Sequence, residues 1–406
     1  MKKPEFLKNQ SVVNAICIGS LCSVSYLAIY FARNIFGAVS PKMLESGFSE
    51  EFIGTASFIY LICYGIGQLI NGRIGDKVKS RYMISMGLFF SGITNLIFAK
   101  FAASSPTTAM IIYGLTGYFL SMIYGSITKV VAENTELVYA TRCSMGYTFA
   151  SFIGSPMAGV AAAALTWQSV FMSSTAALVI MSMVCFSVFI IYEKKGIVQY
   201  GKFKAKKQKN GGGIKQLIKR QIIKFSFISM VTGIVRTTVV FWLPTYISQY
   251  LGFSAEKAAS IFTVTTFIIS FTTFIAIFVY EKLGRNMNKT ILIMFSLSTV
   301  FFALTYFVKH PVLNIVLITL AIMANGSCST MLYSRYCPGL VDTGMVSSVT
   351  GYIDFVSYMA AAISSKLFAN AAISIGWGNL ILVWCGLELF GVAISLPRKK
   401  GELKNV

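Results

Sequence analysis

Two arginines, Arg33 and Arg236, lie inside apolar stretches long enough to cross a membrane. Inserting an arginine at the centre of such a helix costs about 2.5–3.5 kcal/mol, so these residues usually face a water-filled pathway. The planar guanidinium pairs bidentately with phosphate or carboxylate oxygens. The two residues therefore predict an anion-binding site. The plainer alternative is that buried carboxylates neutralise them, and Asp354 and Glu388 are the acids found within such stretches.

Tyrosines accompany both arginines. Tyr26 and Tyr30 precede Arg33 by seven and three positions, which places all three on one face of a helix. Phenol donors beside a guanidinium would extend a phosphate site, whereas the alternative is ordinary aromatic packing. Tyr246 follows Arg236 on the same apolar stretch and is a further candidate for contact with a solute.

Other polar residues within apolar stretches leave several interpretations open. Asp354 could be a protonatable coupling site, a salt-bridge partner for an arginine, or an acid hydrogen-bonded to neighbours such as Tyr358. Gln68 and Asn325 could contact a solute or join helix to helix. We assign Glu388 a structural role.

The elements that must position these residues are membrane spans. The chain has 406 residues, of which 55% are hydrophobic and 12% charged, and its mean hydropathy is +0.70. Soluble domains are usually nearer 25% charged. Apolar runs of the ~20 residues that a span needs recur along the chain. We predict an all-α polytopic membrane protein with twelve spans, near residues 12–38, 52–73, 82–100, 108–130, 140–165, 168–192, 221–249, 257–280, 289–308, 312–334, 345–369 and 375–396.

The net charge of +21 is read as a topology signal. With both termini in the cytoplasm, lysines and arginines concentrate in the cytoplasmic segments, above all between 194 and 224, as the positive-inside rule requires. We therefore expect a multi-pass protein of the cell inner (plasma) membrane, with membrane lipids as neighbours. Nucleic acid is not an expected partner.

The two halves of the chain repeat one another. Arg33 and Arg236 are 203 positions apart, and Gly47-Phe48-Ser49 recurs 205 positions later as Gly252-Phe253-Ser254. Because six spans is an even number, the halves form a parallel repeat about an axis along the membrane normal. We predict six-helix bundles at 1–193 and 221–406, joined by a basic, flexible linker at 194–220. The two arginines are then expected at similar depth, facing one another across the axis.

Enzymatic chemistry is not expected. The only histidine is His310, and the eight cysteines include no CxxC pair. Neither a metal site nor a nucleophile–base arrangement can be recognised from these residues. We expect no cofactor and a monomeric protein.

The six-plus-six plan and the loop from Gly72 to Arg81 resemble the major facilitator superfamily. Tyr26-x3-Tyr30-x2-Arg33 and Arg236-x5-Trp242 resemble its organophosphate:phosphate antiporter branch, which includes glycerol-3-phosphate and hexose-phosphate transporters. The resemblance implies that Arg33 and Arg236 bind a phosphoryl group and that Tyr26 and Tyr30 line the site. It also implies a conformational-switch loop in each half, carried by Gly72, Asp76, Arg81, Glu281 and Arg285.

The sequence departs from this branch in three places. Asn34 and Gln68 stand where the branch usually carries lysines, and the fifth span has no histidine between Tyr147 and Pro156. The site then carries less positive charge than is usual in the branch, and a less charged anion or a phosphonate would fit as well.

We therefore expect a secondary active transporter of small phosphorylated organic anions. It would work by alternating access, in exchange for inorganic phosphate. One alternative is a proton-coupled symporter of carboxylates or other organic anions that uses Asp354. Another is a membrane sensor that binds a sugar phosphate without transporting it.

Overall fold

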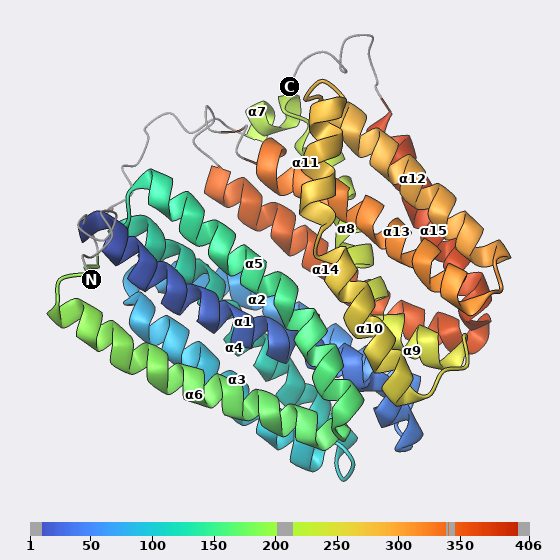
Figure 1. Cartoon of the computed structure of the whole chain (residues 1–406), viewed down its shortest axis with the longest axis horizontal. Coiled ribbons are helices and arrows are strands. Elements are labelled where there is room, and N and C mark those ends of the chain that lie inside the picture. Colours follow the sequence, from blue (N-terminus) through green and yellow to red (C-terminus); the bar gives the residue numbers. More distant parts are fainter. Residues whose placement is uncertain (1–9, 201–213, 338–339, 341–345, 397–406) are drawn as a thin grey trace, which may run out of the picture. The chain divides into compact units, whose positions relative to one another are not determined.

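The computed structural model of the chain is helical throughout its described part (Figure 1). It describes residues 10–200, 214–337, 340 and 346–396. At a few helical positions (10, 76, 137, 138, 141, 144, 145, 148, 152, 214–216 and 346–348) it describes the backbone alone.

The described residues of the first half form six long helices. They are α1 (Gln10–Glu45), α2 (Glu50–Lys77), α3 (Ser80–Phe101), α4 (Pro106–Asn134), α5 (Leu137–Ala164) and α6 (Trp167–Lys194). Local sequence explains where several of them begin. Pro106 occupies the first turn of α4, where its missing N–H costs nothing, and the Thr166 hydroxyl accepts from the Ser169 N–H to cap α6.

Helices of the second half are more often interrupted. They are α7 (Ile214–Lys219), α8 (Ile222–Gly233), η2 (Ile234–Val239), α9 (Val240–Gln249), α10 (Ala255–Ile269), α11 (Thr272–Lys282), α12 (Met287–Phe307), α13 (Pro311–Met331), η3 (Leu332–Tyr336), α14 (Val346–Ser374) and α15 (Gly376–Ser395). The elements η2 and η3 are π-helical turns within otherwise α-helical spans. Such turns are frequent at functional sites.

Among the described residues, ten helices are long and apolar enough to cross a membrane. The two remaining predicted spans, near 140–165 and 345–369, correspond to α5 and α14, which have 28 and 29 residues. Both exceed the ~20 residues that a span needs. The predicted fold class of an all-α polytopic membrane protein is confirmed.

The repeated Gly-Phe-Ser turn has the same geometry in both copies. Gly47 and Gly252 adopt φ values of 93° and 75°, the left-handed conformation that glycine tolerates best. The hydroxyl of Ser49 then accepts the Phe52 N–H, and Ser254 caps α10 in the same way. The internal repeat is therefore visible in backbone conformation as well as in residue identity.

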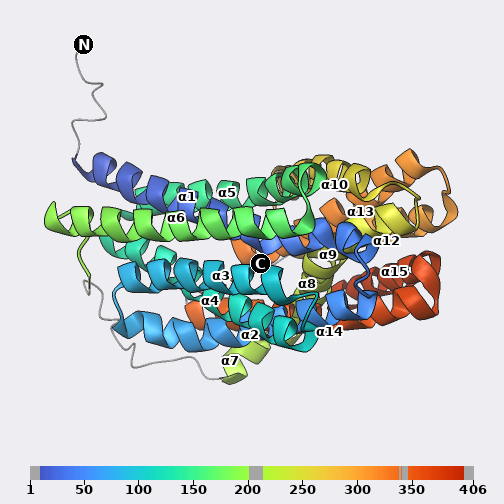
Figure 2. The ribbon, with the colours of Figure 1, turned by 90° about the horizontal axis from the view of Figure 1, so that it is seen from below.

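The described chain divides into two compact units, and the first comprises residues 1–39 and 62–207. Within it α3 packs between α4 and α6 (Figures 1 and 2). Four aromatic side chains from α1, α3, α4 and α6 fill its core with ring centroids 4.7–6.3 Å apart: Phe36, Phe98, Tyr113 and Phe171.

The second unit comprises residues 40–61 and 208–406. In it α12 packs against α13 and α15, and α14 packs against α8. The segment 40–61 belongs here through close contacts: the hydroxyls of Ser40 and Thr245 are hydrogen-bonded at 2.6 Å. A Cβ at Gly54 would lie 2.5 Å from that of Ala369, so only glycine allows this approach. The division into repeats at 1–193, 194–220 and 221–406 stays a prediction.

Candidate functional site

Arg33 lies half-buried in α1 with its guanidinium against two tyrosine rings. Its Cζ is 5.4 Å from the ring centroid of Tyr30 and 4.6 Å from that of Tyr64 on α2. Both distances are within the ~6 Å of a cation–π contact. Tyr26 continues the row, with its ring 4.9 Å from that of Tyr30. The helix face inferred from spacing is thus present in the structure, while the binding roles of these residues stay predictions.

Further tyrosines from α4 and α5 complete the group. The rings of Tyr124 and Tyr147 each lie 5.7 Å from Tyr26 and 6.4 Å from one another. We call Tyr26, Tyr30, Tyr64, Tyr124 and Tyr147 the tyrosine cluster. Phenols are donors and acceptors, so together with one guanidinium the cluster offers what an anionic oxygen requires, without a second positive charge.

A glycine allows α5 to approach this group closely. A Cβ at Gly154 would lie 2.5 Å from the Cβ of Tyr30, closer than two such atoms approach. Gly154 therefore permits the passage of α5 across α1 at this level.

Sequence reasoning missed Tyr64, Tyr124 and Tyr147 as members of the group. One signal could have found Tyr64: it precedes Gln68 by four residues, which places the two on one face of α2. Gln68 itself is half-buried. Asn34 is the other position where the resembling branch usually carries lysine. Its amide donates to the Tyr30 carbonyl oxygen at 2.6 Å within α1.

In the second unit, Arg236 lies in the π-turn η2 and is exposed. Its Cζ is 5.8 Å from the ring centroid of Tyr333, which lies in the other π-turn, η3. The Tyr333 hydroxyl donates to Asp354 Oδ1 on α14 at 2.8 Å. Both π-turns therefore contribute a side chain to one group, in which a tyrosine contacts an arginine and an acid.

Tyr246 lies apart from this group. It follows Arg236 by ten positions, a rise of about 15 Å along the helix. Its side chain is fully buried, and its hydroxyl donates to Asn314 Oδ1 at 2.5 Å. Its ring stacks on Tyr250 with centroids 5.2 Å apart. A role for Tyr246 in solute binding stays a prediction, and its described contacts are those of a packed core.

Two other polar residues of the spans pair with each other. The Asn325 amide on α13 donates to Glu388 Oε1 on α15 at 2.7 Å, and both side chains are fully buried. This pair joins helix to helix, which is one of the two interpretations left open for Asn325.

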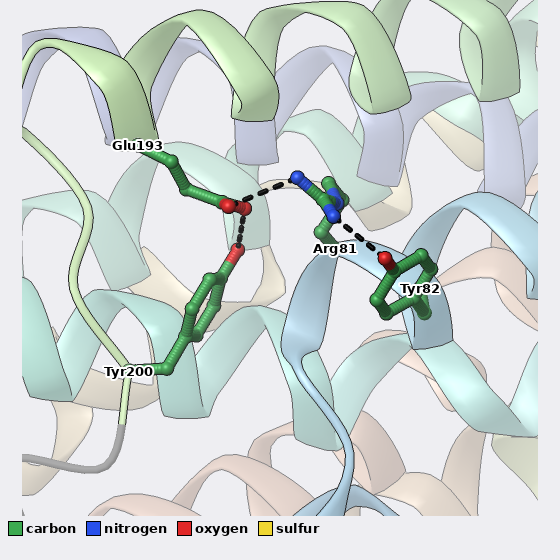
Figure 3. Close-up of polar contacts among 4 residues, drawn as sticks. All are labelled: Arg81, Tyr82, Glu193 and Tyr200. Carbon is green, nitrogen blue, oxygen red and sulfur yellow. Dashed lines mark hydrogen bonds and ion pairs between the residues drawn. The ribbon is translucent and has the colours of Figure 1, made fainter.

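The loops resembling conformational switches differ in their contacts. Arg81 Nη1 donates to Glu193 Oε2 at 2.9 Å, and Arg81 Nη2 donates to the Tyr82 hydroxyl at 2.8 Å (Figure 3). Gly72 is exposed with open space around it, whereas the side chain of Asp76 lies outside the described residues.

In the corresponding loop of the second unit, Glu281 and Arg285 are both exposed. Gly284 and Arg285 have φ values of 70° and 58°, and the Arg285 N–H bonds to the Tyr280 carbonyl oxygen at 2.8 Å. This bond and the left-handed backbone of the two residues end α11 in a tight turn.

Apolar helices of spanning length define a multi-pass membrane protein, and an arginine among tyrosines within such helices is a candidate functional site. The chain belongs to the Major Facilitator Superfamily, whose model matches residues 22–365. It is thus a member of a family of transporters.

Relatives and solved structures agree with this assignment. The chain is 24% identical to the glycerol-3-phosphate transporter of Bacillus subtilis over 86% of its own length and 83% of the relative's. It is 24% identical to the phosphoglycerate transporter protein of Salmonella typhimurium, covering 94% and 88%. The membrane sensor protein UhpC of Escherichia coli is also 24% identical, over 60% of each chain. A D-xylose-proton symporter has the same fold, with a TM-score of 0.75, 12% identity and coverage of 95% and 98%.

Proposed function

We propose that the protein moves a small phosphorylated organic anion across the inner membrane by alternating access, in exchange for inorganic phosphate. The observation that carries the proposal is Arg33, held between the rings of Tyr30 and Tyr64 within the tyrosine cluster. Similarity to transporters of glycerol-3-phosphate and phosphoglycerate supports a phosphorylated solute.

The chemistry of the first unit favours a phosphoryl group over a bare carboxylate. A guanidinium fork satisfies two oxygens, and a phosphoryl group has further oxygens for the phenols of Tyr26 and Tyr30. Arg236 would supply the second fork, so that a bound anion offsets one positive charge from each half. Loaded carriers would then reorient more readily than empty ones, because a ligand shifts an equilibrium toward the state that it stabilises more. Obligatory exchange follows from that difference.

The setting that we propose for this activity is a monomer in the inner membrane with both termini in the cytoplasm. Its partners are the anionic solute, inorganic phosphate and the surrounding lipids, with no role for nucleic acid. Large exposed apolar side chains on the helices, such as Phe274 and Phe278 on α11, support contact with lipid.

The position of Asp354 favours a second candidate mode of transport, which is proton coupling. Asp354 is half-buried and accepts a hydrogen bond from Tyr333, which contacts Arg236. A carboxylate in this position could exchange a proton during transport and make the protein a proton-coupled carrier of organic anions.

Radiolabelled phosphate uptake into proteoliposomes distinguishes these modes. Vesicles are loaded with unlabelled phosphate, buffer alone or a pH gradient, and challenged with phosphate esters, phosphonates and carboxylates as competitors. We expect uptake only when a counter-solute is inside, and strongest competition by phosphate esters. Carboxylate uptake driven by the pH gradient without phosphate movement would replace exchange by proton coupling. Saturable binding of a phosphate ester with no movement in any condition would indicate a sensor.

A further inference from the structure

The residues that follow α6 fold back onto the end of the first unit instead of leaving it. Gly196 adopts a φ of 69°, and the N–H groups of Ile197 and Val198 bond to the Tyr192 carbonyl oxygen at 2.9 and 3.3 Å. These bonds close the last turn of α6. Val198 is 2% exposed, so the returning chain is packed against its neighbours.

Two further bonds fix this segment to other helices. The Gln199 N–H donates to Asn134 Oδ1 at the end of α4, at 2.7 Å. The Tyr200 hydroxyl donates to Glu193 Oε1 at 3.1 Å (Figure 3). The Lys79 ammonium lies 5.7 Å from the Tyr200 ring centroid, within cation–π range. The start of the interdomain linker is therefore held at several points.

Tyr200 also reaches the first turn of α3. The backbone N–H of Arg81 faces the Tyr200 hydroxyl. First-turn amides have no partner within their own helix, and the residue before α3, Lys79, provides no side-chain cap. The same phenol donates to Glu193 at the end of α6, so it lies between α3 and α6. Burial, followed by the charge of Glu193, raises the pKa of Tyr200 well above its usual value, so the phenol keeps the proton that it donates.

Glu193 links Tyr200 to Arg81 through its two carboxylate oxygens. Oε1 accepts from Tyr200, while Oε2 accepts from the Arg81 guanidinium in an ion pair whose side chains are 11% and 21% exposed. Arg81 in turn lies over the rings of Tyr82 and Phe186, at 4.6 and 5.3 Å. Loosening either partner of Glu193 leaves a half-buried charge with fewer hydrogen bonds, which is costly.

We propose that residues 195–200 form a strap that locks the α2–α3 loop to the end of α6, with Tyr200 as the residue that closes it. The strap connects the start of the linker to Lys79 in that loop and, through Glu193, to Arg81 in the first turn of α3. Any rearrangement of that loop during transport has to open the strap or carry it along. Residues 195–200 are then a working part of the cytoplasmic side and more than a passive tether. This inference holds whichever solute the protein carries.

Hydrogen exchange of the full-length protein in nanodiscs tests the strap without a transport assay. Tyr200→Phe keeps the ring but removes the hydrogen bond to Glu193 and the oxygen that faces the Arg81 N–H. We expect about fivefold faster exchange, typical of one lost hydrogen bond, in the peptides that contain Gln199 and the Arg81 amide. Tyr82→Phe is the matched control: it removes the neighbouring bond from Arg81 to Tyr82 and should leave the peptide containing Gln199 at the wild-type rate. Unchanged exchange in α12 shows that the variants are folded.

A second variant approaches the strap from its other end. Asn134→Ala removes the acceptor for the Gln199 N–H, and because the strap acts as one unit, exchange should also rise at Arg81. Wild-type exchange at Arg81 and Gln199 in Tyr200→Phe would overturn the proposal. So would an equal effect of Tyr82→Phe on Gln199, or, if Tyr200→Phe does not fold, an Asn134→Ala effect confined to Gln199.

Discussion

The guanidinium of Arg33 lies 4.6 Å from the centre of the Tyr64 ring, which holds it against α2. A ring contact of this kind acts on the face of the guanidinium, whereas anions pair with its N–H edge. Tyr64 is therefore expected to matter for binding through its ring.

Replacing Tyr64 tests this role. Tyr64→Leu removes the cation–π contact and should weaken solute binding about two- to thirtyfold, as expected for ~0.5–2 kcal/mol. Tyr64→Phe keeps the ring and serves as the matched control, with binding much closer to wild type. The measurement is the concentration of phosphate ester that half-inhibits labelled phosphate uptake. Equal half-inhibitory concentrations for Tyr64→Leu and Tyr64→Phe would show that the ring of Tyr64 does not contribute to solute binding.

Gln68 offers a test of site charge. It lies one turn beyond Tyr64 on α2, and the resembled branch usually carries lysine there. Gln68→Lys adds a positive charge near Arg33 and should favour a doubly charged anion, by about fivefold for ~1 kcal/mol of added attraction. Competition by phosphate against a singly charged phosphonate ester, compared between pH 6 and pH 8, measures the preference. If the binding of both anions became stronger by the same factor, the added charge would not discriminate between doubly and singly charged solutes.

Asp354 and Tyr333 separate exchange from proton coupling. Asp354→Asn keeps an oxygen that can accept from the Tyr333 hydroxyl but cannot exchange a proton. Under the exchange mechanism, phosphate uptake by this variant should stay within about threefold of wild type, a change near 0.6 kcal/mol. An imposed pH gradient should not change the rate of phosphate uptake by the wild type or by the variant. Gradient-driven uptake that is present in the wild type and absent from the variant would establish coupling through Asp354.

The buried Asn325–Glu388 pair makes a prediction about stability. Asn325→Leu leaves fully buried Glu388 without its amide donor and should destabilise the protein by about 2 kcal/mol. The double change Asn325→Leu with Glu388→Leu removes both polar partners and should recover most of that loss. Thermal unfolding of the purified variants measures both effects. A double variant less stable than the single one would show that Glu388 has other essential partners.

Helical spacing was enough to predict part of the site. Tyr26, Tyr30 and Arg33 share a face because positions three, four and seven apart always do, whatever the helix packs against. The same logic predicted the two halves, because repeated residues such as Ser49 and Ser254 occupy equivalent turns. These features depend on local geometry, which sequence displays directly.

The remainder of the site depends on contacts between helices, which have no spacing signal. Tyr147 and Tyr124 reach Tyr26 from other spans, and only the packing of α4 and α5 brings them there. The π-turns around Arg236 and Tyr333 could not be predicted either, since spans that are apolar on most faces show little periodicity in which an inserted residue could be recognised. The linker was expected to be flexible along its whole length, and its first residues were not expected to carry Tyr200 into a bonded position.

The most direct test of the central claim is phosphate exchange by Arg33→Lys in proteoliposomes, with Arg142→Lys, at an exposed arginine of α5, as the matched control. Lysine keeps the charge but lacks the bidentate fork, so exchange should fall by about ten- to a hundredfold, typical of losing a charge-assisted hydrogen bond. Arg142→Lys should exchange at the wild-type rate. Near-wild-type exchange by Arg33→Lys would contradict the assignment of Arg33 as the residue that binds the phosphoryl group.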